Sequence, residues 1–288
     1  MPISPMFQRL SPLMGLDVMD ALSHTRVILC GLGGVGSWCA EALVRSYIGH
    51  ISIVDSDTVC ITNINRQVQA IGATIGQFKA DALKTRLEGI NPACEVAAYR
   101  GAFSKETAGS FGIEQADYII DAIDSLTYKL DLIEYAWGAA IPIFSSMGMA
   151  QKLDPARLTT GDIWETKGCP LARLVRSGLR KRGFTGHFTA VYSPERLPLH
   201  EEAGTACGSA HCLCPSRTGC GAGERPIEWC GSKKVINGSA ITVTATAGMI
   251  LASLVLQDIY ARCHRGQGGQ SPKPLHRVPV PQEASFHG

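Results

Sequence analysis

The chain lacks a surplus of charge of either sign. Its 288 residues include 27 Lys and Arg against 25 Asp and Glu, a formal net charge of +2. A chain this close to neutral is neither a basic protein that coats nucleic acid nor an acidic disordered chain, so any basic surface must be local. Hydrophobic residues make up 45% and charged residues 18%, which is typical of a globular protein with one large or two small domains.

The chain also lacks a secretory signal and the cysteine density of a disulfide scaffold. Residues 1–19 contain prolines, Arg9 and Asp17 where a signal peptide has a continuous apolar core. The 11 cysteines are odd in number and too sparse for a disulfide-stabilised fold. We therefore expect the protein to work in a reducing cytoplasm.

Charged residues are absent from 235–257, a stretch long enough to span a membrane. Apolar residues alternate with threonine from Ile241 to Thr244, which predicts a strand, and a helix is predicted from about Thr246 to about Ala261. Divided in this way, neither piece crosses ~30 Å of hydrocarbon, so we expect no membrane span.

Short apolar runs alternate with segments of helical periodicity in the first half of the chain. We predict strands over 26–31, 51–54, 95–99, 117–123 and 141–145, and helices over 34–47, 76–90 and 125–140. Such alternation is typical of a doubly wound, mostly parallel sheet. The predicted fold class is α/β, a Rossmann-like sheet with a C-terminal crossover and a substrate-facing extension.

We divide the chain into four stretches. An N-terminal arm, 1–25, precedes a Rossmann-like, ATP-binding half, 26–150. The second half of the same domain, 151–262, contains a basic helix within 166–184, a strand over 188–192 and an insertion over 194–232 that is rich in Gly, Pro and Cys. A loose tail, 263–288, contains four prolines.

A glycine-rich turn joins the first predicted strand to the first predicted helix. Gly31, Gly33, Gly34 and Gly36 allow a tight turn and let phosphate oxygens approach the amides of a helix N-terminus. Asp55 ends the second strand ~20 residues after the last glycine, where a carboxylate can accept the ribose hydroxyls. This pattern predicts an adenine-nucleotide site and, alone, leaves NAD, FAD and ATP open.

Polar residues follow the second and fourth predicted strands, at the sheet edge where such folds bind ligands. They are Asp57, Asn63, Arg66, Gln67 and Lys79 after the second strand, and Asp124 and Ser125 after the fourth. A triphosphate carries about twice the charge of a pyrophosphate, so the cations Arg66 and Lys79 favour ATP over NAD. A carboxylate of Asp121-Ala-Ile-Asp124 can hold magnesium through one or two oxygens.

Four motifs resemble the superfamily of ubiquitin-activating enzymes and their bacterial relatives in thiamine and molybdopterin synthesis, which adenylate carboxylates with ATP. The motifs are GLGGVGS, VDSDTVCITNINRQ, GQFKAD and DAIDS. Within the superfamily, the chain resembles the tRNA threonylcarbamoyladenosine dehydratases. That resemblance rests on Phe7, Arg9, Leu13, Gly15, Asn65, IPIFSSMGMAQKLDP at 141–155, Asp162-Ile163 and CPLARLVRSGLRKRGF at 169–184. It covers residues 7–193 and 236–260.

The resemblance implies a role for each candidate residue. Arg66 and Lys79 would contact the phosphates of ATP, and Asp124 would serve the metal or the reacting carboxylate. Arg9 would reach the ATP of a partner subunit, which implies a homodimer with two composite sites. These four are the catalytic candidates, and the nucleotide site also includes Gly31, Gly33, Gly34, Gly36, Asp55, Asp57, Asn63, Gln67 and Ser125.

The resemblance also implies a reaction, with ATP and magnesium as cofactors and modified tRNA as partner. The threonyl carboxylate attacks the α-phosphate, pyrophosphate leaves, and a nitrogen or oxygen of the same carbamoyl group closes a ring and expels AMP. Positioning and charge neutralisation suffice for this chemistry, and the intramolecular second step requires no enzymic nucleophile. The ring form of the product and a sulfur-transfer partner stay open.

One stretch, 166–194, carries basic residues and no Asp or Glu. Arg173, Arg176 and Arg180 fall on one face of the predicted helix at i, i+3 and i+7. With Lys181 and Arg182 they form a basic stripe on a nearly neutral chain, which predicts a tRNA-binding surface. An ordinary solvated helix face is the alternative.

The insertion gathers Cys207, Cys212, Cys214 and Cys220, with Cys230 and His211 nearby. Their spacing is not the paired CxxC of a structural zinc site, which the thiamine and molybdopterin relatives usually carry. A zinc or iron–sulfur site, a redox-responsive loop and free thiols all stay open. A thioester nucleophile at Cys207 or Cys212 is a further alternative.

Three other functions compete with the dehydratase. An adenylyltransferase acting on the C-terminal glycine of a ubiquitin-like or sulfur-carrier protein would use the same ATP site. An NAD-dependent oxidoreductase would need only the glycine turn and Asp55, and Arg66, Lys79 and Asp124 argue against it. A non-catalytic sensor would bind nucleotide or metal without turnover.

Overall fold

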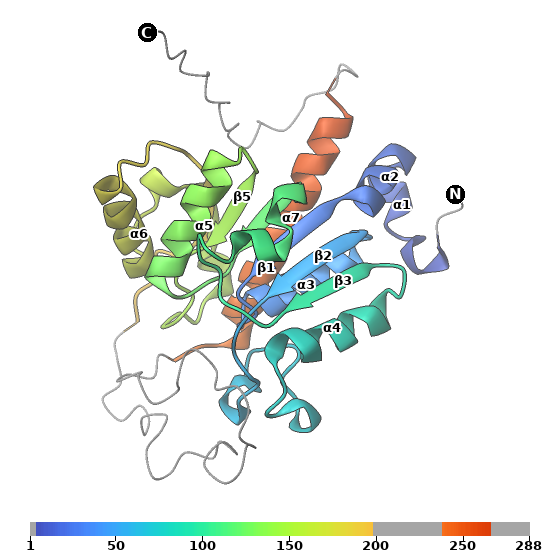
Figure 1. Ribbon diagram of the computed structural model, residues 1–288, viewed down its shortest axis with the longest axis horizontal. Coiled ribbons are helices and arrows are strands. Elements are labelled where there is room, and N and C mark those ends of the chain that lie inside the picture. Colours follow the sequence, from blue (N-terminus) through green and yellow to red (C-terminus); the bar gives the residue numbers. More distant parts are fainter. Residues whose placement is uncertain (1–3, 198–237, 266–288) are drawn as a thin grey trace.

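The computed structural model describes residues 4–197 and 238–265. Within these ranges, seven strands form one sheet in the order β3-β2-β1-β4-β5-β7-β6 (Figure 1). The strands are β1 Arg26–Cys30, β2 His50–Val54, β3 Glu95–Tyr99, β4 Tyr118–Asp121, β5 Ile143–Ser146, β6 Thr159–Asp162 and β7 Thr189–Tyr192. Every pair is parallel except β6 with β7. The predicted mostly parallel, Rossmann-like α/β sheet is confirmed.

Helices cover both faces of this sheet, as a doubly wound fold requires (Figure 1). They are α1 Ser11–Met14, α2 Leu16–His24, α3 Gly36–Arg45, α4 Lys79–Ile90, α5 Leu126–Gly138, α6 Pro170–Lys181 and α7 Ile241–Cys263. One core lies between the sheet and α2, α3, α4 and α7. A second core lies between the sheet and α5 and α6.

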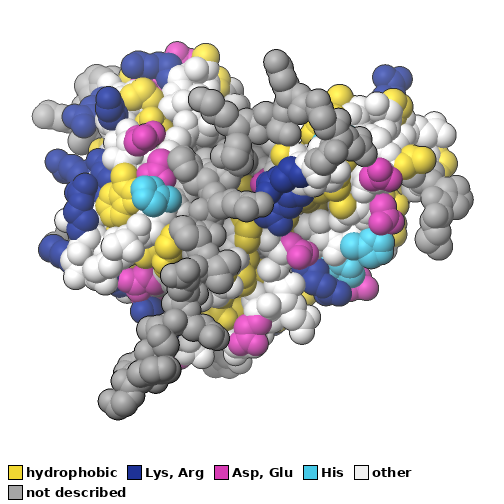
Figure 2. Space-filling view, turned by 90° about the horizontal axis from the view of Figure 1, so that it is seen from above, with side chains coloured by type: hydrophobic (Ala, Val, Ile, Leu, Met, Phe, Trp, Pro, Cys, Tyr) yellow, Lys and Arg dark blue, Asp and Glu magenta, His cyan; other side chains and the backbone are white. Residues whose placement is uncertain are grey.

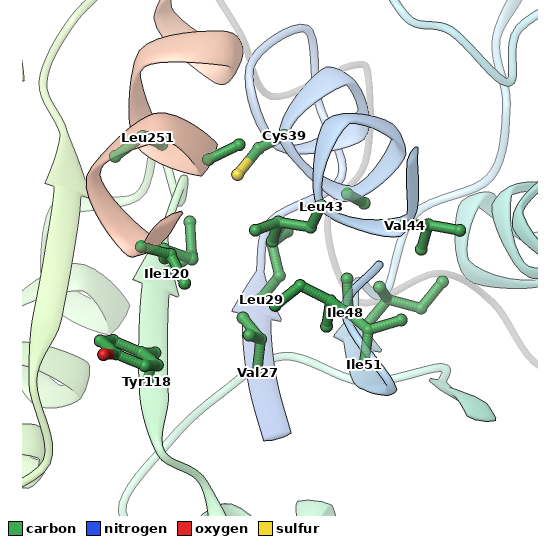
Figure 3. Close-up of a cluster of buried hydrophobic side chains, with 14 of the residues drawn as sticks. Val27, Leu29, Cys39, Leu43, Val44, Ile48, Ile51, Tyr118, Ile120 and Leu251 are labelled. Atoms are coloured by element: carbon green, nitrogen blue, oxygen red, sulfur yellow. The ribbon is translucent and has the colours of Figure 1, made fainter. Parts of the chain in front are cut away.

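Strand β1 supplies both cores because its side chains alternate in direction. Val27 and Leu29 belong to the first core, and Ile28 and Cys30 to the second. Figure 3 shows Val27 and Leu29 beneath α3, with Leu43 above them. Burying one such aliphatic side chain stabilises the fold by roughly 1.5–3 kcal/mol.

The winding of the sheet reverses between β1 and β4. The chain runs from β1 through α3 to β2 on one side, and from β4 through α5 to β5 on the other. Open parallel sheets bind ligands at such a reversal, outside the carboxyl ends of the strands. The glycine turn follows β1 and residues 122–125 follow β4, so both predicted segments border this crevice.

From Ile241 onward the uncharged stretch belongs to one continuous helix, so the predicted strand over Ile241–Thr244 is wrong. α7 is 23 residues long, and by length and composition it could cross a membrane. The argument that neither of two shorter pieces could do so therefore fails. Val243, Ala247 and Leu251 lie at i, i+4 and i+8 and are fully buried, which is the helical period that the short alternation hid.

Packing of α7 in the core explains its apolar composition. Half of the most apolar 18-residue segment of α7 is buried inside the protein, and the helix lies against α3 and α2. The helices cross closely at Gly248, where a Cβ atom would lie only 2.5 Å from the carbonyl oxygen of Val35.

The first 24 residues include two helices that pack onto the first core. Phe7 is buried, and its ring centroid lies 4.5 Å from that of Tyr47. In contrast, the side chains of Leu13 and Leu16 are 73% and 72% exposed. This stretch therefore presents apolar surface to its surroundings.

Candidate functional site

The glycine turn is tight and is closed from the side of β4. Gly31 has a φ of +93°, and a Cβ atom there would lie 2.6 Å from the carbonyl oxygen of Ala122. At Gly36 a Cβ atom would lie 1.8 Å from the carbonyl oxygen of Gly31. Any side chain at these two positions would force the turn open, so glycine is required where β1 passes into α3.

Two side chains hold the peptide groups of Leu32 in this turn. Its N–H donates to Oδ2 of Asp55 over 2.6 Å, and its carbonyl accepts from Nε2 of Gln69 over 2.8 Å. The other oxygen of Asp55 accepts from the N–H of Asp57 over 2.8 Å. The predicted ribose-binding carboxylate thus also fixes the turn beside it.

Lys79 begins α4 and lies between two carboxylates. Its Nζ is 2.5 Å from Oδ2 of Asp57 and 3.9 Å from Oδ1 of Asp55. Burial alone would lower the pKa of Lys79, but the charges of Asp55 and Asp57 outweigh it and raise the pKa above its ordinary value. Burial raises the pKa of Asp55, against the opposing charge of Lys79. Lys79 is therefore a permanent, buried cation at the edge of the crevice.

Arg66 lies on the loop between β2 and α4. Its carbonyl accepts from Nε1 of Trp38 over 2.9 Å, which ties the loop to α3. Partial burial lowers the pKa of its guanidinium, and the charge of Asp124 opposes this shift. The charge of Asp124 also raises the pKa of Lys79. The structure therefore brings Arg66, Lys79, Asp55 and Asp124 to one edge of the sheet, as the sequence predicted.

Three further predicted residues lie in the connections that border the site. Asn63 is buried, and its Oδ1 accepts from the N–H of Cys60 over 3.0 Å, which closes a turn. Gln67 is also buried, next to Gln69. Ser125 precedes α5, and its carbonyl accepts from the N–H of Lys129.

A buried ion pair beneath the site was not foreseen. Nζ of Lys129 lies 2.7 Å from Oδ2 of Asp121, and neither side chain is exposed. Ser145 donates to the same carboxylate oxygen over 2.5 Å, and the carbonyl of Ser146 accepts from Lys129 over 3.0 Å. Of the two aspartates offered as metal ligands, this network occupies Asp121, while Asp124 is exposed. Asp121 ends β4 and Lys129 lies in α5, so no spacing in the sequence reveals the pair.

Arg9 does not join this cluster within its own chain. It follows Phe7, which contacts Tyr47 between α3 and β2, at the amino ends of the strands. The cluster lies at the carboxyl ends of the strands. Each strand residue adds ~3.3 Å of length, so the strands separate Arg9 from the cluster. Figure 1 likewise shows the N-terminal helices well away from the loop that follows β2.

The predicted basic stripe is only partly available to a ligand. Arg173, Arg180 and Lys181 are exposed. NH1 of Arg176 donates to the carbonyl of Thr166 over 2.9 Å, and Arg182 pairs with Asp131 over 2.6 Å and Glu134 over 3.1 Å. Dark-blue side chains still gather at the left of Figure 2, the side on which α6 lies in Figure 1.

The predicted metal ligands Cys207, Cys212, Cys214 and Cys220 lie outside the described residues. Across 4–197 and 238–265, no three His, Cys, Asp or Glu side chains form a cluster that could hold a metal. A cavity of about 470 Å³ lies elsewhere, beside Arg26, His50 and Glu95 at the amino ends of three strands. It is thus not the crevice that holds the nucleotide candidates.

Known proteins are similar to this chain in sequence and in fold. The model of the ThiF family matches residues 7–264. The tRNA threonylcarbamoyladenosine dehydratase of Bacillus subtilis is 42% identical over 66% of this chain and 74% of its own length. The enzyme of the same name from Escherichia coli is 32% identical over 88% of this chain and 92% of its own length.

A solved structure extends the similarity to three dimensions. The E. coli tRNA N6-threonylcarbamoyladenosine dehydratase, TcdA, in complex with ATP, superposes with a TM-score of 0.73 at 29% identity. The match covers 90% of this chain and 96% of TcdA. A second structure of that enzyme contains AMP. The sequence motifs, the crevice above β1 and β4 and these similarities together show that this chain belongs to the ThiF family.

Proposed function

We propose that this protein is an ATP-dependent tRNA threonylcarbamoyladenosine dehydratase. The observation that carries the proposal is the convergence of two cations, Arg66 and Lys79, with Asp55 and Asp124 at the reversal of the sheet. Relatives that match most of the chain bear this name, and one of them was solved with ATP. Because ATP and tRNA are both cytoplasmic, we place the reaction in the cytoplasm.

The first step would activate an unreactive acid. A carboxylate oxygen of the threonyl group attacks the α-phosphorus, the bond to the β-phosphate oxygen breaks, and pyrophosphate leaves. Arg66 and Lys79 would neutralise the charge that accumulates on the departing pyrophosphate. Asp55 would hold the ribose, and the amides at the start of α3 would face the phosphates.

The second step would close a ring without an enzymic nucleophile. A nitrogen or oxygen of the same carbamoyl group attacks the activated carbonyl, and AMP leaves with one oxygen of the original carboxylate. The substrate thereby loses the elements of water. Holding both groups of one substrate in the crevice supplies the rate advantage of an intramolecular reaction.

Asp124 is the residue that would hold magnesium. Magnesium is usually bound through one or two carboxylates together with substrate phosphates. The side chain of Asp124 is exposed at the crevice, whereas that of Asp121 is fully buried. When bound, the ion would supply additional positive charge for the triphosphate.

A homodimer would complete the site. Arg9 lies at the amino ends of the strands, so it would meet an ATP only if that ATP belonged to a second copy. The exposed Leu13 and Leu16 would supply apolar surface for the contact. Equal mixing of an Arg9→Ala chain with a Lys79→Met chain tests this, since composite sites would restore one intact site per mixed dimer.

The exposed cations of α6 would bind tRNA. We expect Arg173→Glu with Lys181→Glu to weaken tRNA binding at least tenfold and to reduce its salt dependence, with ATP affinity unchanged. Arg182→Gln is the matched control, because Arg182 is already paired with Asp131 and Glu134. Equal tRNA affinity of the double variant and the native protein would contradict this assignment.

Pyrophosphate exchange into ATP tests the proposed function. Exchange should depend on tRNA that carries threonylcarbamoyladenosine and should fail with unmodified tRNA. Exchange that depends instead on a carrier protein with a C-terminal glycine would establish the adenylyltransferase alternative. Neither exchange nor turnover, with ATP bound, would point to the sensor.

A further inference from the structure

The side-chain amide of Asn65 connects the loop of Arg66 to the start of α7. Its Nδ2 donates to the carbonyl of Ser239 over 2.9 Å, and its Oδ1 accepts from NH1 of Arg66 over 2.9 Å. Asn65 and Ser239 are 174 residues apart in the sequence. One planar amide therefore fixes a guanidinium relative to a distant helix.

Arg66 is oriented through one nitrogen alone. Both protons of NH1 are used, one on Asn65 and the other on the carbonyl of Thr62 at 3.0 Å. Nε and NH2 have no hydrogen-bond partner in the part of the chain that the structure describes. These two atoms carry three N–H groups, and the fork that they form matches phosphate oxygens.

The anchor at Ser239 is firm. α7 is packed in the first core, and the carbonyl of the preceding Gly238 accepts from the N–H of Gln151 over 2.9 Å. A Cβ atom on Gly34 would lie 3.1 Å from both Cγ of Arg66 and Oγ1 of Thr244. The stem of Arg66 and the first turn of α7 therefore both lie close to the glycine turn at Gly34.

The part of the loop just before Arg66 has little apolar burial of its own. Ile61 and Ile64 are 36% and 45% exposed, and Asn65 is exposed as well. Without the amide bridge, the guanidinium of Arg66 would have to be ordered when ATP binds, and the lost side-chain entropy would reduce affinity. The bridge makes that ordering part of the folded protein.

We propose that Asn65 is a positioning residue, which prepares Arg66 for the phosphates that ATP has and AMP lacks. The inference deepens the proposed function and rests on its assignment of Arg66 to the phosphates. It predicts that Asn65 affects ATP binding and leaves AMP binding unchanged. A residue that only stabilised the fold would affect both.

Calorimetric titration with ATP and with AMP tests this without any tRNA. Asn65→Ala should weaken ATP binding about tenfold and change AMP binding less than twofold, with the midpoint of thermal unfolding unaltered. The neighbouring exposed side chain provides the control, so Ile64→Ala should bind both nucleotides as the native protein does. In an Arg66→Ala background, Asn65→Ala should weaken ATP binding by no more than a further twofold.

Three results would overturn the inference. They are unchanged ATP affinity in Asn65→Ala, equal losses for ATP and AMP, and a full additional loss in the Arg66→Ala background. Failure of the native protein to bind ATP at all would instead overturn the proposed function, so the two failures are distinct.

Discussion

Lys79 shows at the scale of one residue how a buried charge is prepared for a ligand. Asp55 and Asp57 outweigh the effect of burial and raise its pKa above the ordinary 10.5. The ammonium group therefore stays charged through neutral and mildly alkaline pH. A cation held in this way needs no reorganisation when phosphate arrives.

Replacing Lys79 should weaken the binding of nucleotide. We expect Lys79→Met to weaken ATP binding at least tenfold, because Asp55 and Asp57 would then repel the phosphates unopposed. In the native protein, the ammonium group of Lys79 should stay charged between pH 7 and 10, so its titration should cause no loss of ATP affinity in that range. Calorimetry checks both, with Lys84→Met, five residues further along α4, as control.

Lys129 and Asp121 are a second buried pair, and their cost to stability depends on which partner is lost. Lys129→Met leaves the carboxylate of Asp121 buried without its cation, so we expect a loss of about 3–5 kcal/mol in the free energy of unfolding. Adding Asp121→Asn removes that charge and should restore at least half of the loss. Urea unfolding of the single and double variants measures this. Additive losses would show that the two residues act independently.

At the scale of elements, the crossing of α3 and α7 depends on one missing side chain. A Cβ atom at Gly248 would lie 2.5 Å from the carbonyl oxygen of Val35 and 2.9 Å from the nitrogen of Cys39. Because both neighbours are backbone atoms, we expect Gly248→Ala to destabilise the protein by about 1–3 kcal/mol.

A matched glycine within α4 supplies the control. A Cβ atom at Gly89 would meet nothing within 4 Å, so Gly89→Ala should be neutral or stabilise by up to ~1 kcal/mol. Thermal unfolding of the two variants gives the comparison. Similar midpoints for both would mean that the helices do not cross as closely as described.

Glu41 connects α3 to α4. Its carboxylate accepts from Nε of Arg86 over 2.6 Å and from Nε of Arg45 over 2.9 Å. Burial alone would raise the pKa of Glu41, but the two arginines outweigh burial and lower the pKa below 4.5. The stability that this group contributes is therefore complete above pH 4.5 and is lost as the pH falls through the lower, folded pKa.

We expect Glu41→Gln to lose roughly 1–3 kcal/mol of unfolding free energy at neutral pH. Its stability should also fall less steeply than that of the native protein below pH 4.5, because the titrating group is gone. Glu88→Gln is the control, since Glu88 is 47% exposed and its pair with Lys84 contributes little. Parallel acid-unfolding curves for Glu41→Gln and the native protein would contradict the assignment.

Helices and strands with a clear apolar periodicity could be predicted from the sequence. Those whose structure depends on packing against distant parts of the chain could not. β3 was predicted at its observed bounds, and α4 and α5 within three residues, because apolar spacing and flanking turns define them. β6 was missed, because a four-residue edge strand with two exposed threonines has no apolar pattern of its own. The first four residues of α7, Ile241–Thr244, matched a strand, and the packing of the helix on α3 decides for helix.

The candidate residues of the site could be predicted from the sequence, but the residues that hold them in place could not. Asp55 and Asp124 follow the ends of β2 and β4, and Arg66 and Lys79 follow in the connection from β2 to α4. Chain order and chemistry both indicate a ligand at this edge of the sheet. Gln69 and Lys129 act through contacts with Leu32 and Asp121, which no spacing in the sequence reveals. Arg176 and Arg182 matched the basic stripe, yet their protein partners appear only in three dimensions.

At the scale of the whole molecule, the sheet, both helical layers and the loops at the reversal act together to join ATP to an acid. The account requires that an oxygen of the acid itself ends on the nucleotide. It also requires two copies of the chain if Arg9 is to take part. These requirements distinguish carboxylate adenylation from any reaction that merely hydrolyses ATP beside tRNA.

The most direct measurement follows that oxygen. Threonylcarbamoyladenosine in tRNA, labelled with oxygen-18 in its carboxylate, is incubated with the protein, magnesium and ATP, and the products are resolved by mass spectrometry. The account predicts AMP that carries one labelled oxygen, unlabelled pyrophosphate and a tRNA nucleoside that has lost one labelled oxygen with the elements of water. Unlabelled AMP, or ADP and phosphate formed beside a nucleoside that keeps both labels, would contradict it.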